Sequence, residues 1–348
     1  MSSSRRTFVK AAASVAVAAN RMAAAQERIP SRAVPFSAPP VGSPVLKSVR
    51  TPVLEIGYEE TWGGRGGGDP ATPPAILLHG FPDDVRAWDG VVPALAAGGV
   101  RRVLVPYLRG FGPTRFLDSA TPRMAEQAAI GQDLIDFADA LNIKTFDVIG
   151  YDWGGRAACV AAALHPERVT GAVLIGGYTI QNVFSPPVPE APETEHAYWY
   201  QWYFNTERGR AGLTANRRAL CKLLWKLWSP NMQFTDEQFE RTAKSFDNPD
   251  FVDCVIHSYR HRHGNAPGEP RFEADERKLA QFPRINAPTV LVHGADDGIR
   301  KPPAESAEQP HFPHLVFRRV VAGAGHFVPR ERPDSVMAAL RDIGQDRL

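Results

Sequence analysis

Along residues 46–177, short apolar runs alternate with stretches of helical periodicity. The apolar runs predict strands, and the spacing of Ile130, Leu134, Phe137 and Leu141 predicts a helix. Strands are expected near residues 46–62, 75–78, 102–106, 146–150 and 169–176, and helices near 85–97, 125–141 and 154–164. Buried strands that alternate with helices predict an α/β fold with a mostly parallel central sheet flanked by helices.

This alternation stops at Tyr178. Residues 178–285 are rich in Trp, Tyr, Phe and Arg at helical spacing, without an apolar strand run. Strand patterns return at 288–292 and 315–321, followed by a helical pattern at 334–343. We therefore predict a core formed by residues 46–177 and 286–348, with residues 178–285 inserted as a helical cap domain.

The first 45 residues are predicted to stand apart from this fold. Arg5 and Arg6 precede a mildly apolar stretch, and Ala23-Ala24-Ala25 supplies an A-x-A cleavage pattern. The paired arginines followed by an aromatic residue resemble the twin-arginine signal of bacterial export. We expect residues 1–25 to be a signal peptide and residues 26–45 a linker, which implies a periplasmic or secreted protein.

Composition narrows the possible partners to a small molecule. The 348 residues carry a net charge of +2 without a basic tract outside the N-terminus, so no nucleic-acid partner is expected. No apolar run reaches the roughly 18 residues that a membrane span needs. Three widely spaced cysteines argue against a disulfide framework or a zinc site, and no phosphate-binding motif indicates a cofactor. The oligomeric state has no signal in the sequence.

A nucleophile is predicted at Asp152, between the strand ending at Gly150 and the following helix. Gly150-Tyr151-Asp152-Trp153-Gly154 has the form G-x-nucleophile-x-G, in which glycines permit a sharp turn. A carboxylate that attacks saturated carbon leaves an ester that water can hydrolyse, whereas a serine would leave a stable ether. The pattern indicates attack on an epoxide or a carbon–halogen bond. At this point Asp152 could instead serve only as a helix cap.

Three further motifs resemble those of the α/β-hydrolase superfamily, and within it those of the epoxide hydrolases with an aspartate nucleophile. His79-Gly80-Phe81-Pro82 resembles the H-G-x-P motif, which implies an oxyanion hole made by the backbone N–H groups of Phe81 and Trp153. The resemblance also implies a triad acid after the strand 288–292, at Asp297 with Asp296 as the alternative. It implies a general base at His326, and His79 and His293 are interpreted as structural.

The cap carries the features that point to epoxides. Tyr200 lies in a Y-Q-x-Y-F stretch and Tyr259 in a second motif before an arginine, both similar to the ring-opening tyrosines of epoxide hydrolases. Trp202 is a candidate substrate-binding residue. The aromatic-rich cap favours a hydrophobic substrate. The run Arg260-His261-Arg262-His263 is interpreted as a solvated surface.

Other functions stay open at this point. Haloalkane dehalogenases share the Asp-Trp pair, although they usually carry a side-chain donor such as Asn at Phe81. Fluoroacetate dehalogenases share H-G-F-P and Arg156, but this chain has Trp153 and Gln201 at their arginine and cap-histidine positions. A binding or structural module is disfavoured because no triad member is missing, and a promiscuous esterase is the remaining alternative.

Overall fold

The computed structural model describes residues 44–62, 72–97, 101–185 and 188–345. The predicted signal peptide, and the predicted linker apart from its last two residues, lie outside the described residues. No helix within these ranges is both long and apolar enough to span a bilayer. The same residues contain no group of three or more His, Cys, Asp or Glu side chains suited to a metal ion.

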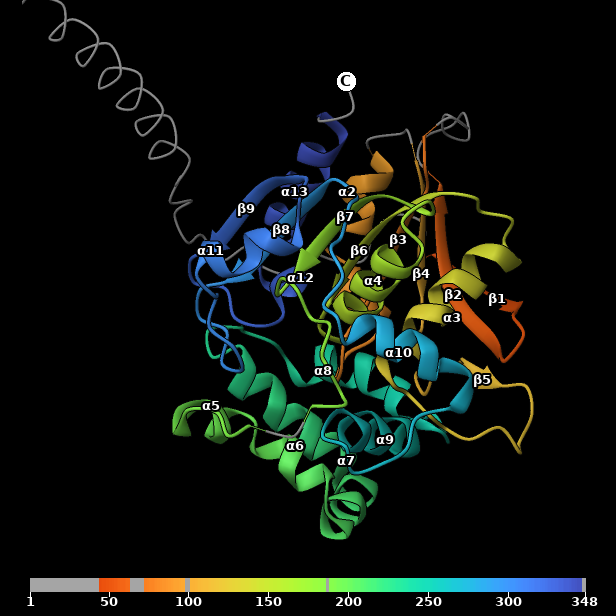
Figure 1. The fold of residues 1–348 in the computed structure, drawn as a ribbon, viewed down its shortest axis with the longest axis vertical. Helices are drawn as coiled ribbons and strands as arrows, with labels where there is room; N and C mark the ends of the chain where they lie inside the picture. Colours follow the sequence, from red (N-terminus) through yellow and green to blue (C-terminus); the bar gives the residue numbers. More distant parts are fainter. Residues whose placement is uncertain (1–43, 63–71, 98–100, 186–187, 346–348) are drawn as a thin grey trace, which may run out of the picture. The chain divides into compact units, whose positions relative to one another are not determined.

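A sheet of nine strands runs through the described residues, in the order β1-β2-β4-β3-β6-β7-β8-β9, with β5 paired to β2 (Figure 1). The strands are β1 (Val45–Arg50), β2 (Leu54–Trp62), β3 (Ala75–Leu78), β4 (Arg102–Pro106), β5 (Arg115–Phe116), β6 (Phe146–Tyr151), β7 (Val169–Ile175), β8 (Thr289–Gly294) and β9 (Leu315–Val321). From β4 through β3 to β9 all pairs are parallel, whereas β2 pairs antiparallel with β1, β4 and β5. The predicted mostly parallel α/β sheet is confirmed.

Helices flank this sheet. They are η1 (Val85–Trp88), α2 (Val92–Ala97), α3 (Gln127–Ala140), α4 (Asp152–Leu164), α11 (Glu305–Glu308), η4 (Gln309–His311), α12 (Val328–Glu331) and α13 (Pro333–Gln345). Helix α4 packs against α3 and over β6 and β7, and α13 packs against β7, β8 and β9. The prediction of one helix over 85–97 is wrong, because this segment forms a 3-10 turn and a separate helix, α2. Helix α2 has Pro93 in its first turn, where the N–H that proline lacks would have no partner in the helix.

The segment between β7 and β8 is helical, as the predicted cap requires. Its helices are α5 (Pro192–Ala197), α6 (Trp199–Phe204), α7 (Glu207–Trp228), α8 (Asp236–Ala243), η2 (Lys244–Asp247), α9 (Phe251–Arg262), η3 (Pro270–Phe272) and α10 (Glu273–Leu279). Figure 1 shows α5 to α9 gathered below one end of the sheet. Helix α10 differs, because it returns to the core and packs against α3 and α4.

Candidate active site

The turn between β6 and α4 carries Asp152 in a left-handed conformation, with φ of +52°. Residues with a side chain seldom adopt that region, although Asp and Asn do so more readily than others. A Cβ at Gly150 would lie 2.3 Å from the Gly154 carbonyl oxygen, and one at Gly154 would lie 2.2 Å from the Leu78 carbonyl oxygen. Both glycines are therefore required by the close approach of the backbone, which places the Asp152 side chain at the end of the sheet.

Hydrogen bonds and charge stabilise the ionised form of Asp152. Its Oδ1 accepts a 2.7 Å hydrogen bond from the Phe81 N–H, and its carboxylate also accepts one from the Trp153 N–H. Burial alone would raise the pKa of Asp152, but the hydrogen bond and charge of His326, together with these two N–H groups, lower it below the ordinary value. The structure thus brings the N–H groups of Phe81 and Trp153 to the carboxylate, and the bond from Phe81 to Pro82 is cis.

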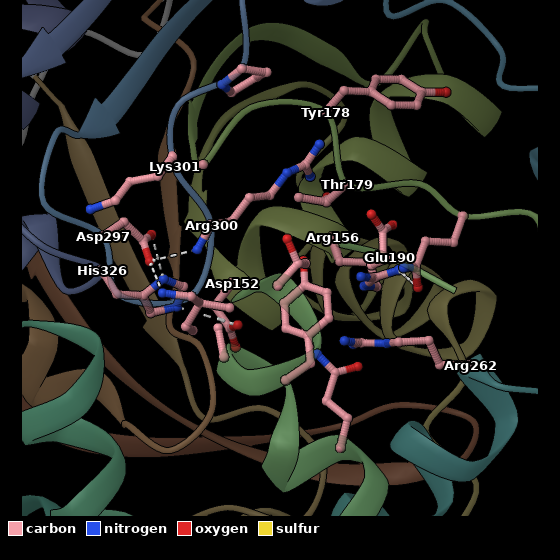
Figure 2. Close-up of a pocket in the computed structure, with 18 of the residues that line it drawn as sticks. Asp152, Arg156, Tyr178, Thr179, Glu190, Arg262, Asp297, Arg300, Lys301 and His326 are labelled. Atoms are coloured by element: carbon pink, nitrogen blue, oxygen red, sulfur yellow. Dashed lines mark hydrogen bonds and ion pairs between the residues drawn. The ribbon is translucent and has the colours of Figure 1, made fainter. Parts of the chain in front are cut away.

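His326 lies between two carboxylates, as Figure 2 shows. Its Nε2 is 3.4 Å from Asp152 Oδ2, and its Nδ1 is 2.8 Å from Asp297 Oδ2. Burial disfavours the imidazolium, but Asp297 and Asp152 outweigh it and raise the pKa of His326 to about 10. Asp297 in turn accepts the backbone N–H groups of Ile299 (2.7 Å) and Arg300 (3.1 Å) through Oδ1. His326 therefore contacts both predicted carboxylates.

The choice between Asp297 and Asp296 follows from these contacts. Asp296 points elsewhere, because its Oδ2 accepts a 2.7 Å hydrogen bond from Asn231. Asp297→Asn is expected to lower turnover by about 10²- to 10⁴-fold, because the imidazole loses the charge that orients it and stabilises its protonated form. Asp296→Asn is the matched control and should keep turnover within about twofold, since surface changes rarely matter. Steady-state kinetics of the pair measure this, and equal losses would refute the assignment.

The end of cap helix α7 supports the loops that carry Asp297 and His326. The Trp228 carbonyl accepts the N–H groups of Gly298 and His326, each at 3.0 Å. The Ser229 hydroxyl accepts the Phe327 N–H (3.0 Å) and donates to Glu331 (2.6 Å). Sequence reasoning missed this support, because no motif marks Ser229 or Glu331 and their contacts span about a hundred positions.

The two cap tyrosines meet above the turn. Tyr200 on α6 and Tyr259 on α9 are buried, with ring centroids 5.3 Å apart, and both interact electrostatically with Asp152. The Tyr200 hydroxyl accepts a 3.1 Å hydrogen bond from Gln201. Among the described residues, the Tyr259 hydroxyl and the nearby Trp153 indole N–H lack a hydrogen bond of regular geometry. Burial raises the pKa of both phenols, so they are neutral donors near pH 7.

A cavity of about 1080 Å³ opens between core and cap beside Asp152 and His326. Tyr200 and Trp202 line it, and the Trp202 ring lies 4.3 Å from the ring of His263. The lining also carries several cations, namely Arg156, Arg262, Arg300 and Lys301 (Figure 2). The cavity is therefore more charged than the aromatic composition of the cap suggested.

The interpretation of residues 260–263 as a solvated surface is wrong. His261 is buried, and Arg262 and His263 line the cavity. Arg260 is bound to the Phe204 carbonyl (3.2 Å) and to Glu207 (2.9 Å). The C-terminal end of α9 packs over the site, and the pattern of charges in the sequence does not predict such packing.

A sequence model described as the alpha/beta hydrolase fold matches residues 73–333, about three quarters of the chain. The chain belongs to the α/β-hydrolase family. This assignment agrees with the nucleophile turn at Asp152 and with the parallel order of β4, β3, β6, β7, β8 and β9. It confirms the fold class and the hydrolase class that the sequence predicted.

Proteins similar to this α/β-hydrolase include epoxide hydrolases. Epoxide hydrolase A of Mycobacterium tuberculosis is 25% identical over 334 residues, which cover 87% of this chain and 98% of that protein. Epoxide hydrolase B of the same organism is 32% identical over 154 residues, and that match spans only 42% of its length. The crystal structure of a "putative epoxide hydrolase" from Klebsiella pneumoniae superposes with a TM-score of 0.81 at 39% identity, over 87% of this chain and 97% of that one.

Two other histidines of the hydrolase core occupy strand ends without reaching Asp152. His79 is buried, and burial lowers its pKa to about 4. Its ring nitrogens bond to Gly80 O (3.0 Å) and to the N–H of Leu108 (3.1 Å). His293 is buried 3.0 Å from Glu308. Their contacts fit the structural role that the sequence indicated.

Proposed function

We propose that this enzyme hydrolyses an epoxide to a vicinal diol through a covalent alkyl ester on Asp152. The observation that carries the proposal is the set of groups that surround the Asp152 carboxylate. Two backbone N–H groups and His326 hold it in the ionised form, and two buried phenols lie above it on the cap. A nucleophile, an oxyanion hole, a base with its acid and two proton donors thus meet at one point.

The first step is ring opening. An Asp152 oxygen attacks one epoxide carbon, the carbon–oxygen bond of the ring breaks, and Tyr200 or Tyr259 donates its proton to the departing oxygen. The resulting phenolate is matched by the imidazolium of His326, whose pKa is about 10 while Asp152 carries its charge. Passing that proton from His326 to the phenolate restores the tyrosine and leaves a neutral imidazole.

The second step uses this neutral imidazole. Once Asp152 is an ester, its negative charge no longer raises the pKa of His326, so the imidazole can deprotonate a water molecule. The hydroxide attacks the ester carbonyl, and the N–H groups of Phe81 and Trp153 stabilise the oxyanion. Release of the diol returns a carboxylate on Asp152 and a proton on His326, so the cycle closes.

Removing the cap hydroxyls should slow the first step selectively. Tyr200→Phe or Tyr259→Phe is expected to lower the rate of ester formation by about 10²-fold, because general acid catalysis is lost, without slowing ester hydrolysis. Rapid-quench kinetics separate the two rates. Tyr203→Phe is the matched control for Tyr200→Phe, because it lies on the same helix α6 but, unlike Tyr200, does not line the cavity. A loss confined to the hydrolysis step would contradict the assigned role.

One observation favours a second candidate, a dehalogenase with the same nucleophile. The Trp153 Nε1–H is buried, and among the described residues it interacts with the Tyr259 hydroxyl without a hydrogen bond of regular geometry, so it could bind a halide instead. Single-turnover mass spectrometry of the His326→Gln protein distinguishes the two. A mass gain on the Asp152 peptide from styrene oxide supports the epoxide, whereas a gain from a haloalkane alone supports the dehalogenase.

We also propose export through the twin-arginine pathway, supported by Arg5, Arg6 and the A-x-A pattern. The double change Arg5→Lys and Arg6→Lys keeps both charges but should abolish export of the full-length chain. Fractionation of bacterial cells into periplasm and cytoplasm measures this. Undiminished export of the double variant would refute the proposal.

A further inference from the structure

Two arginines that the proposed chemistry does not use face the cavity beside Asp152. Arg156 comes from the first turns of α4, and Arg262 is the last residue of α9 on the cap. Both line the cavity, and Figure 2 shows Arg262 reaching into it on the opposite side of Asp152 from His326. Within the described chain, neither guanidinium lies within 4.0 Å of a carboxylate, although half-buried arginines ordinarily find one.

Arg156 is held in place by neutral groups. Its Nη1 donates to the side-chain oxygens of Gln181 (3.0 Å) and Gln127 (3.4 Å). Amides accept hydrogen bonds but do not compensate charge. Gln127 separates Arg156 from Glu276, to which it donates a 2.8 Å hydrogen bond. The Nε and Nη2 groups of Arg156 have no partner among the residues described, so they remain available to a ligand.

Arg262 has even fewer partners. Its guanidinium forms no hydrogen bond or ion pair within the described residues, and it lies over the Tyr259 ring at 4.7 Å from the centroid. Burial is the main cause that lowers the pKa of Arg156 to about 9, and the like charge of the neighbouring Arg262 lowers it further. Such a pair is stabilised when an anion binds both members.

The carboxylates that line the described cavity form no ion pair with this pair, although the charge of Asp152 acts on Arg156 from a distance. Glu190, Glu193 and Glu195 line the cavity, but none forms an ion pair with either arginine. Burial and Arg262 lower the pKa of His263 to about 4, so this neighbour is neutral. Tyr259 lies between Arg262 and the reacting centre, because its ring contacts Arg262 and its hydroxyl interacts electrostatically with Asp152.

We propose that Arg156 and Arg262 bind a carboxylate on the substrate, so that the enzyme acts on epoxides that carry a carboxylate away from the ring. This inference rests on the proposed epoxide chemistry at Asp152 and specifies its substrate class. A carboxylate fits because its two oxygens accept parallel hydrogen bonds from one guanidinium while the second supplies charge. The aromatic cap residues then contact the chain between the two ends.

The test compares terminal epoxides that end in a carboxylate with carboxamides of the same length, for several chain lengths. For at least one length, kcat/KM should favour the acid by about tenfold or more, the effect of one charged hydrogen bond. Arg156→Met and Arg262→Met should each bring this ratio toward one. Lys301→Met removes another, exposed cation of the cavity lining and should leave the ratio unchanged.

Equal turnover of acids and amides at every length would overturn the inference while leaving the epoxide hydrolase standing. So would a ratio that survives both arginine changes, or one that Lys301→Met lowers equally. If no epoxide is consumed, calorimetry with the saturated carboxylic acids decides separately. Binding that Arg262→Met weakens about tenfold supports the anion site without the epoxide chemistry, and absence of binding refutes it. Arg262 makes no hydrogen bond in the described chain, so its replacement should leave folding intact.

Discussion

Replacing Asp152 by alanine is expected to abolish epoxide turnover, with a loss on the order of 10⁴-fold or more, as for nucleophiles of other hydrolases. The reason is chemical. His326 could still activate water, but direct attack of water on the epoxide lacks the preorganised carboxylate and the ester that the oxyanion hole binds. Steady-state kinetics measure the loss, and mass spectrometry should find no adduct on this peptide.

The same change has structural side effects that the experiment must separate. Asp152 has a φ of +52°, and alanine in that region costs roughly 1–2 kcal/mol. Removing the carboxylate also removes one of the two charges that raise the pKa of His326, so this pKa should fall. Thermal unfolding therefore accompanies the kinetics, with Asp296→Ala as the matched control. A folded Asp152→Ala protein that keeps turnover within tenfold would exclude the proposed nucleophile.

The core of the site could be predicted because its signals are local. The turn at Asp152 needs glycine two positions before and after it, and the strand and helix on either side have clear periodicity. Asp297 and His326 each follow a strand that the sequence marks. The short elements β5, α11 and α12 have only two to four residues, too few to show a period, and they were missed.

The parts that could not be predicted depend on how the cap docks. Arg262 belongs to a run of charged residues of the kind that usually lies on a solvated surface. It lines the cavity because α9 packs over the site. Ser229 and Glu331 are unremarkable in sequence, yet they hold the backbone beside His326. The contact from Ser229 to Glu331 joins residues about a hundred positions apart, for which periodicity and short motifs carry no information.

His326→Gln should separate the two chemical steps. Glutamine cannot accept a proton from water, so ester hydrolysis should slow by about 10²- to 10⁴-fold while Asp152 is still alkylated. Single-turnover mass spectrometry should then detect a persistent adduct on the Asp152 peptide, which the wild type loses. The Asp152→Ala protein is the negative control. A variant that hydrolyses its ester at the wild-type rate would contradict the role of His326.

The pH dependence of the two steps provides an independent test of the same role. The pKa of Asp152 is lowered below 3.8, so ester formation should not change with pH near neutrality. Ester hydrolysis requires neutral His326, so its rate should rise with pH. In the free enzyme the pKa of His326 is about 10, with Asp152 and Asp297 both charged. Esterification removes the charge of Asp152, so the midpoint for hydrolysis should lie below 10. Asp297→Asn should lower this midpoint of the pH dependence further, because Asp297 stabilises the imidazolium. If the midpoint does not change, Asp297 does not stabilise the imidazolium, and the catalytic residues are Asp152 and His326 alone.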